Sequence, residues 1–200
     1  MATADLYRLA STSSWVATVA FVLSAIAIAL FFAGAGSFWG PVNDALIVVT
    51  AIALIPVVLA VGRQGGDHGS PWTGILTIAT IAGLVLMATG QSLLIVGRLS
   101  LDGSYVTGGI GLLPLLIWMV LVAVLSLSVG VLPSSVGWLA VLSLAAVIAE
   151  GVVAAVTMGP ALWVVSVALV AAVTAFFGSL GTAFASSAAA AAANIVRSAA

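Results

Sequence analysis

The feature that most constrains this chain is how few of its side chains carry a charge. Its 200 residues contain four arginines, four aspartates, one glutamate and no lysine, so charged residues make up 4% of the sequence. A soluble globular domain has charges on about a quarter of its residues, which keep its surface hydrated. A chain with so few charged groups cannot cover a whole surface in water, so most of it must contact lipid. The sequence therefore predicts an integral membrane protein.

The apolar segments predict transmembrane helices rather than the strands of a barrel. Backbone groups in hydrocarbon must be hydrogen-bonded within the protein, which leaves helices and closed barrels as spanning structures. Barrel strands alternate apolar and polar residues, whereas the stretch from Trp15 to Phe32 is apolar on every side. A spanning helix needs about 20 apolar residues, which gives room for about six spans. We expect an all-α, polytopic transmembrane helical bundle.

Prolines, glycines and charged residues divide the chain into six predicted spans. These spans are Ser14–Gly34, Pro41–Val61, Trp72–Val96, Ile110–Val129, Trp138–Val156 and a sixth from Ala161 to at least Leu180. Residues 1–13 are expected to form an amphipathic lead-in at the membrane interface, and residues 14–180 the bundle. The alanine-rich residues 181–200 either continue the last helix into solvent or bend near Gly178 and Gly181 and lie along the interface.

The positions of the arginines predict the orientation. Cytoplasmic loops of membrane proteins are enriched in Lys and Arg. With six spans, Arg8, Arg63 and Arg197 lie on one side of the membrane and Arg98 lies on the other. We therefore expect both termini in the cytoplasm. The lysine-free composition, rich in Ala, Val and Gly, is typical of a bacterial chain, so we expect the bacterial plasma membrane.

Glu150 is an acidic residue past the middle of the fifth predicted span. A charge at the centre of a span costs about 2.5–3.5 kcal/mol, and such acids commonly mark ion or proton pathways. Ser143 lies two helical turns earlier on the same helix face. Two interpretations remain open, a proton or cation site and a neutral carboxyl group hydrogen-bonded across a pair of helices.

Gln91 and Asp44 are further candidate members of an ion or proton site. Gln91 shares one face of the third predicted span with three threonines and is placed to meet Glu150 in the bundle. Asp44 lies in the first turn of the second span, where it would guard an entrance. Ordinary structural interpretations also apply, because threonines can bond their own backbone and an acid in a first helical turn meets the positive end of the helix dipole.

Small residues at helical spacing predict where helices approach one another closely. Membrane helices associate where glycine and alanine let two backbones come together. The predicted contact residues are Gly83 and Gly90 in the third span, Gly151 in the fifth, and Ala175 and Gly178 in the sixth.

Missing residue types and motifs exclude several classes of function. Without lysine there is no retinal Schiff base and no lysine nucleophile. Without cysteine there is no disulfide or thiolate metal site. The sequence also lacks an HExxH motif and a phosphate-binding loop, and it has no basic patch for nucleic acid. We expect no cofactor, no metal, no nucleic-acid partner and no enzymatic activity.

Three segments carry a resemblance to known proteins: GVLPSSVGWLAVL (130–142), GPVNDALIVVTAIALIPVVLAVGR (40–63) and LYRLAS (6–11). They resemble parts of small six-helix bacterial membrane proteins of unknown function, many of them actinobacterial, and cover about a quarter of the chain. The chain departs from that group in lacking a basic residue after Pro133 and in its alanine-rich tail. The resemblance implies a fold and no particular activity.

Three functions are compatible with these features. The leading hypothesis is a non-enzymatic helical bundle that acts through helix–helix contact, as an accessory subunit of a membrane protein partner or as a homo-oligomer. The alternative is a small transporter or proton-coupled permease in which Glu150 titrates. A third is a lipid or hydrophobic-ligand binder with a pocket near Trp118.

Overall fold

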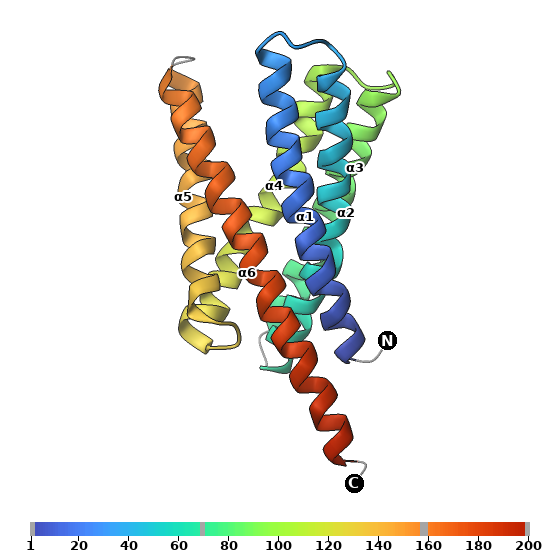
Figure 1. Ribbon diagram of the computed structural model, residues 1–200, viewed down its shortest axis with the longest axis vertical. Helices are drawn as coiled ribbons and strands as arrows, with labels where there is room; N and C mark the ends of the chain where they lie inside the picture. Colours follow the sequence, from blue (N-terminus) through green and yellow to red (C-terminus); the bar gives the residue numbers. More distant parts are fainter. Residues whose placement is uncertain (1–2, 69–70, 157–159, 199–200) are drawn as a thin grey trace.

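The computed structural model describes residues 3–68, 71–156 and 160–198, and within them the chain forms six long α-helices (Figure 1). They are α1 (Thr3–Phe32), α2 (Trp39–Asp67), α3 (Pro71–Ile95), α4 (Leu101–Val124), α5 (Ser134–Val156) and α6 (Pro160–Ser198), with a π-helical turn, η1 (Leu125–Val129), that continues α4. Six helical segments in these ranges are long and apolar enough to cross a membrane. The predicted all-α, six-span class is confirmed.

Several helices begin before the predicted spans or end after them. α1 runs without a break from Thr3, so the residues expected to form a lead-in are its first three turns. α4 begins at Leu101 rather than Ile110 because Ser100 caps it, the Ser100 hydroxyl accepting a hydrogen bond from the Gly103 N–H at 3.1 Å.

The alanine-rich tail belongs to one continuous helix. α6 runs from Pro160 to Ser198 and passes through Gly178 and Gly181 without interruption. At 1.5 Å per residue its 39 residues span about 58 Å, and its end projects past the other helices (Figure 1). Residues 181–198 therefore continue α6 without the bend considered near Gly178 and Gly181.

Successive helices run in opposite directions, so both termini lie at the same end of the bundle (Figure 1). We call this the termini end and the opposite one the far end. α1 to α4 pack side by side in chain order, and α6 lies across α1. α5 packs against α6 and α4, and at the far end the α5–α6 hairpin stands apart from the other helices (Figure 1).

The arginines are distributed over the two ends as the sequence predicts. Arg8 lies near the start of α1, Arg63 near the end of α2 and Arg197 near the end of α6, all at the termini end. Arg98 follows α3 at the far end. Three of the four arginines therefore share one end, and the prediction that this end is cytoplasmic stays a prediction.

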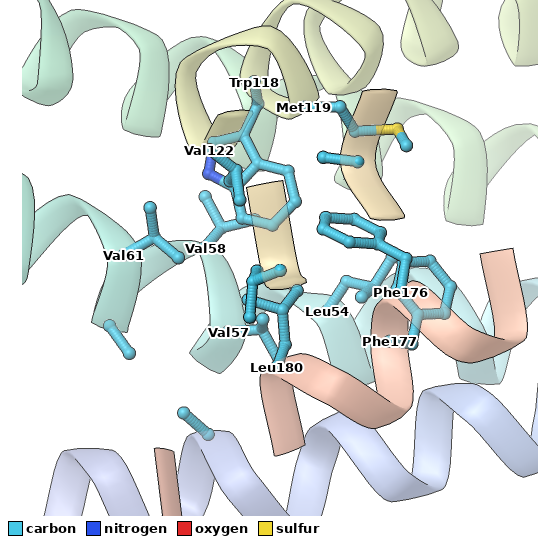
Figure 2. Close-up of a cluster of buried hydrophobic side chains, with 14 of the residues drawn as sticks. Leu54, Val57, Val58, Val61, Trp118, Met119, Val122, Phe176, Phe177 and Leu180 are labelled. Carbon is cyan, nitrogen blue, oxygen red and sulfur yellow. The ribbon is translucent and has the colours of Figure 1, made fainter. Parts of the chain in front are cut away.

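The hydrophobic core lies where α2, α4 and the middle of α6 meet (Figure 2). Trp118 of α4 is fully buried, and its ring meets that of Phe176 edge-on, with 6.2 Å between centroids. Leu54 and Val58 of α2 and Leu180 of α6 complete the packing around them. The Trp118 side chain therefore fills the core of the bundle instead of facing a ligand.

Two serines attach α1 to the backbone of α6. The Ser14 hydroxyl donates to the Phe177 carbonyl at 2.6 Å, and the Ser11 hydroxyl donates to the Gly181 carbonyl at 2.8 Å. The Trp15 ring lies against Gly181, where a Cβ atom would be 2.9 Å from the indole nitrogen. A side chain larger than hydrogen at this position would separate the first and last helices.

Glycines also allow α3 and α4 to approach each other closely. A Cβ atom on Gly83 would lie 2.5 Å from the carbonyl oxygen of Gly111, and one on Gly111 would lie 2.5 Å from the carbonyl oxygen of Gly83. Two turns after Gly83 in α3, toward the far end, Gly90 lies against the side chain of Thr107 in α4. The contact between these helices depends on bare backbone on both sides.

We predict that Gly83→Ala lowers the free energy of unfolding by about 1–3 kcal/mol, the usual cost of overpacking. The new methyl group would meet the Gly111 carbonyl, which is backbone and cannot rotate away. Gly109→Ala on α4 is the matched control, because a Cβ atom there has nothing within 4 Å. Alanine should leave that site unchanged or stabilise it by up to about 1 kcal/mol. Thermal unfolding in detergent, followed by circular dichroism, measures both, and equal effects would contradict the close approach.

Candidate functional site

The candidate site is the pair formed by Glu150 of α5 and Ser166 of α6. The Ser166 hydroxyl donates a hydrogen bond to Oε1 of Glu150 at 2.6 Å. Glu150 is half-buried, and its hydrogen bond joins the two helices of the hairpin. In the described ranges the one ion pair joins Arg63 to Asp67 at 3.6 Å, at the termini end. The observed partner of this carboxyl group is therefore a neutral hydroxyl on a neighbouring helix.

Glu150 belongs to a line of residues on one face of α5 that is well covered at one end and open at the other. Val136, Ala140 and Ser143 are 1%, 0% and 0% exposed. Farther along the same face Val147 and Glu150 are half-buried and Ala154 is exposed. We call these residues the α5 stripe: Val136, Ala140, Ser143, Val147, Glu150 and Ala154. The rest of the chain covers this stripe progressively less toward the far end.

Ser143 adds a second polar group to the α5 stripe. Its Oγ atom is buried and has no hydrogen-bond partner among the described residues. It lies seven residues before Glu150, which is about 10 Å along the helix axis. A buried hydroxyl without a partner is uncommon in a folded protein, so the stripe carries a half-buried carboxyl group and, in its covered part, an unpartnered hydroxyl.

Gln91 does not meet Glu150, contrary to the sequence-based expectation. α3 packs against α2 and α4, whereas Glu150 is bonded to α6. The α5–α6 hairpin lies beside α4 and α1 and does not reach α3 (Figure 1). The Oε1 atom of Gln91 is buried without a hydrogen-bond partner in the described part of the chain.

Asp44 belongs to a separate polar cluster at the far end, between α1 and α2. The Ser24 hydroxyl donates to Oδ1 of Asn43 at 2.7 Å, and Nδ2 of Asn43 donates to Oδ1 of Asp44 at 3.2 Å. Asn43 is buried, and it connects the acid to the neighbouring helix. The three candidate residues Asp44, Gln91 and Glu150 thus lie in three different places.

The predicted contact glycines and alanines divide into two groups. Gly83 and Gly90 lie in the α3–α4 contact, and a Cβ atom on Gly178 would be 3.5 Å from the Trp15 ring. Gly151 was expected in a helix contact, but a Cβ atom there would have nothing within 4 Å. Ala175 is exposed, because α6 turns its opposite face, with Phe176 and Leu180, toward the core.

Ser166 and Ser24 are site residues that sequence reasoning missed. Glu150 and Ser166 lie at nearly equal distances on either side of the turn between α5 and α6. Residues equally far from the turn of an antiparallel helix hairpin lie side by side, so this spacing was available as a signal. Ser24 lies in the helix before Asn43, and its hydroxyl bonds to that residue between α1 and α2.

In comparisons with known proteins, no family model, no curated protein and no solved structure matches the chain. The resemblance of residues 130–142 and 40–63 to small bacterial membrane proteins therefore stays a prediction. The fold defines the class, a helical bundle with six helices able to cross a membrane in its described ranges. Any function must be argued from the geometry of this chain.

We predict that Ser166→Ala shifts the infrared carboxyl band of Glu150, because the carboxyl group loses its hydrogen-bond donor. Glu150 is the only glutamate in the sequence, so isotope labelling of glutamate identifies its band. Unfolding should become easier by about 0.6 kcal/mol, the average for such bonds in membrane proteins. Ser186→Ala on α6 is the control, because that exposed hydroxyl bonds the carbonyl of Thr182 in its own helix. An unchanged band in Ser166→Ala would mean that the pair does not form.

Proposed function

We propose that this protein is a non-enzymatic component of the bacterial plasma membrane that works through helix–helix contact. It would act either by self-association or as an accessory subunit of a larger membrane assembly. The observation that supports this is the α5–α6 hairpin. The most apolar part of α5 is 11% buried and that of α6 is 17% buried, against 44% for α2 and α4.

The chemistry of the α5 stripe favours a protein partner over lipid. An exposed apolar helix face is well solvated by lipid, but a carboxyl group within a membrane span is costly. Glu150 and the unpartnered Ser143 both lie on this stripe. A second helix laid along the open end of the stripe would cover the carboxyl group.

The residues around Glu150 leave room for such a helix. Ala154 lies one turn beyond Glu150 and is exposed, and Gly151 has open space where a side chain would be. Small residues of this kind let two membrane helices approach closely. The lack of lysine and cysteine in the sequence supports the non-enzymatic part of the proposal.

The first test is self-association in liposomes. A single cysteine at Ser37 carries a fluorophore, because the natural chain has no cysteine and Ser37 is exposed in the turn after α1. Ala154→Trp puts a bulky ring on the α5 stripe and should raise the dimer dissociation constant about tenfold, which corresponds to 1.4 kcal/mol. Energy transfer between labelled copies, measured as the protein is diluted in lipid, gives the constant.

Ala145→Trp is the matched control for this test. Ala145 is exposed on the opposite side of α5, nine residues before Ala154, so its substitution changes the same helix without touching the stripe. Equal effects of the two substitutions, or a wild-type protein that stays monomeric at high density, contradict self-association. In the monomeric case, a pull-down from native membranes that recovers a partner with wild-type protein but not with Ala154→Trp supports the accessory-subunit form.

A second candidate function is a small proton-coupled permease, and the Glu150–Ser166 pair favours it. Acidic groups within membrane spans commonly mark proton or ion pathways, and this carboxyl group is bonded to a hydroxyl of the neighbouring helix. The pair also lies in the least covered part of the chain, where the hairpin has the fewest neighbours to hold it.

For the permease we predict that Glu150→Gln abolishes pH-driven uptake into liposomes while leaving thermal stability nearly unchanged. Glutamine has the same size and can still accept the Ser166 hydrogen bond, but it cannot carry a proton at this position. Uptake is followed with an internal pH dye after an imposed pH step, with Asp67→Asn at the exposed termini end as the control. If the wild-type protein moves no protons, or Glu150→Gln moves as many, the permease hypothesis fails.

A further inference from the structure

A shallow hollow lies between α1 and α6 at the termini end, away from the Glu150 site. It has a volume of about 460 Å³ and is lined by Arg8, Ser11 and Thr12 of α1 and by three alanines of α6, Ala185, Ala188 and Ala189. The alanines give it a low floor, because a longer side chain at any of these positions would fill the space. We propose that this hollow binds the phosphate headgroup of an anionic membrane lipid.

The positive charge of the hollow comes from Arg8. Its side chain is exposed, and among the described residues no carboxylate forms an ion pair with it. A guanidinium group presents five N–H donors in a planar fork that matches phosphate oxygens. Arg8 can therefore bind a phosphate without breaking an existing ion pair.

The hydroxyl groups beside Arg8 have different availability. The Ser11 hydroxyl is used in the 2.8 Å bond to the Gly181 carbonyl, which holds α6 against α1. The Thr12 hydroxyl donates to the Arg8 carbonyl over a longer 3.2 Å, within one turn of its own helix. That carbonyl also accepts the regular helix bond, so Thr12 can turn its hydroxyl to a phosphate oxygen at little cost.

The depth of the hollow matches the headgroup region of a bilayer. Arg8 lies six residues before Ser14, the expected start of the hydrocarbon segment, or about 9 Å along the helix. Trp15 lies two turns nearer the far end than Arg8, on the same side of α1. It is half-exposed, and its ring lies against Gly178 and Gly181. Tryptophan in such a position marks the boundary between headgroups and hydrocarbon.

The surface of α1 and α6 on the far-end side of Trp15 is apolar and suits the acyl chains of the same lipid. Val19 of α1 is 56% exposed and lies one turn nearer the far end than Trp15, and Ala175 of α6 is also exposed. A phosphate at Arg8 thus leaves its acyl chains against apolar side chains in the membrane. Basic pockets between membrane helices are a known form of site for anionic lipid headgroups.

The test measures lipid binding to the full-length protein, delipidated in detergent, by native mass spectrometry. The probes are phosphatidylglycerol, zwitterionic phosphatidylcholine and inorganic phosphate. Arg8→Gln should weaken phosphatidylglycerol binding about fivefold, the effect of one arginine near an anionic lipid. Arg98→Gln, which removes an exposed arginine at the far end, should leave binding unchanged.

A second pair of variants tests the hollow without changing any charge. Ala185→Leu fills the floor and should weaken phosphatidylglycerol binding as much as Arg8→Gln does. Ala168→Leu, at an exposed position of α6 about five turns nearer the far end, should leave it unchanged. Circular dichroism checks that all four variants keep their helices.

The proposal is overturned if phosphatidylcholine binds as tightly as phosphatidylglycerol, or if either Arg8→Gln or Ala185→Leu binds phosphatidylglycerol like the wild type. Displacement of the lipid by inorganic phosphate would assign the hollow to free phosphate and would also overturn it. None of these outcomes depends on association through the open end of the α5 stripe, which lies toward the far end.

Discussion

The structure depends on how transmembrane helices associate in lipid, which is as apolar as their own side chains. Lipid gives two apolar helices little reason to leave it for each other, so contacts need close packing and hydrogen bonds. The α1–α6 contact has both. Ser11 and Ser14 donate to carbonyls of α6, and the flat ring of Trp15 replaces lipid over Gly181. The α3–α4 contact also has both, with close packing of Gly83 against Gly111 and a hydrogen bond from the Thr80 hydroxyl to the Pro114 carbonyl at 3.2 Å.

The same requirement explains why α5 is held differently from the others. Near its start Gly137 lies against Ser126 and Leu127 at the end of α4, so the two helices begin in tight contact. Toward the far end the larger part of its contact is with α6, and the Glu150–Ser166 bond lies there. The acid is therefore held by the helix that follows it rather than by the main bundle. Both functions proposed for the hairpin follow from this incomplete enclosure.

The fold class and the number of spans could be predicted because they depend on composition and length. The depth of Glu150 could also be predicted, since it follows from counting residues within a span. The partner of Glu150 could not be predicted from composition, because it depends on which helices become neighbours. Gln91 has a suitable side chain at a suitable depth, but α4 lies between its helix and α5.

The faces of α6 show a second limit of prediction from sequence. One face carries small residues such as Ala175 and the other carries large ones such as Phe176 and Leu180. The small residues predicted that the first face would pack against other helices, but the second face, with its large side chains, lies in the core. The crossing with α1 lies at the edge between the two, where Gly178 and Gly181 meet Trp15. Residue size alone does not predict whether a helix face packs through large side chains or through close approach of two backbones.

The serine contacts of α1 also have a consequence for the order of assembly. Ser11 and Ser14 bond to carbonyls 170 and 163 residues later in the chain. The ribosome synthesises α1 first and α6 last. During synthesis the two serine hydroxyls therefore lack their acceptors, the carbonyl groups of α6. Until the last helix enters the membrane, the flank of the first one is open to any other chain in its vicinity. The molecule closes this flank only with its final segment.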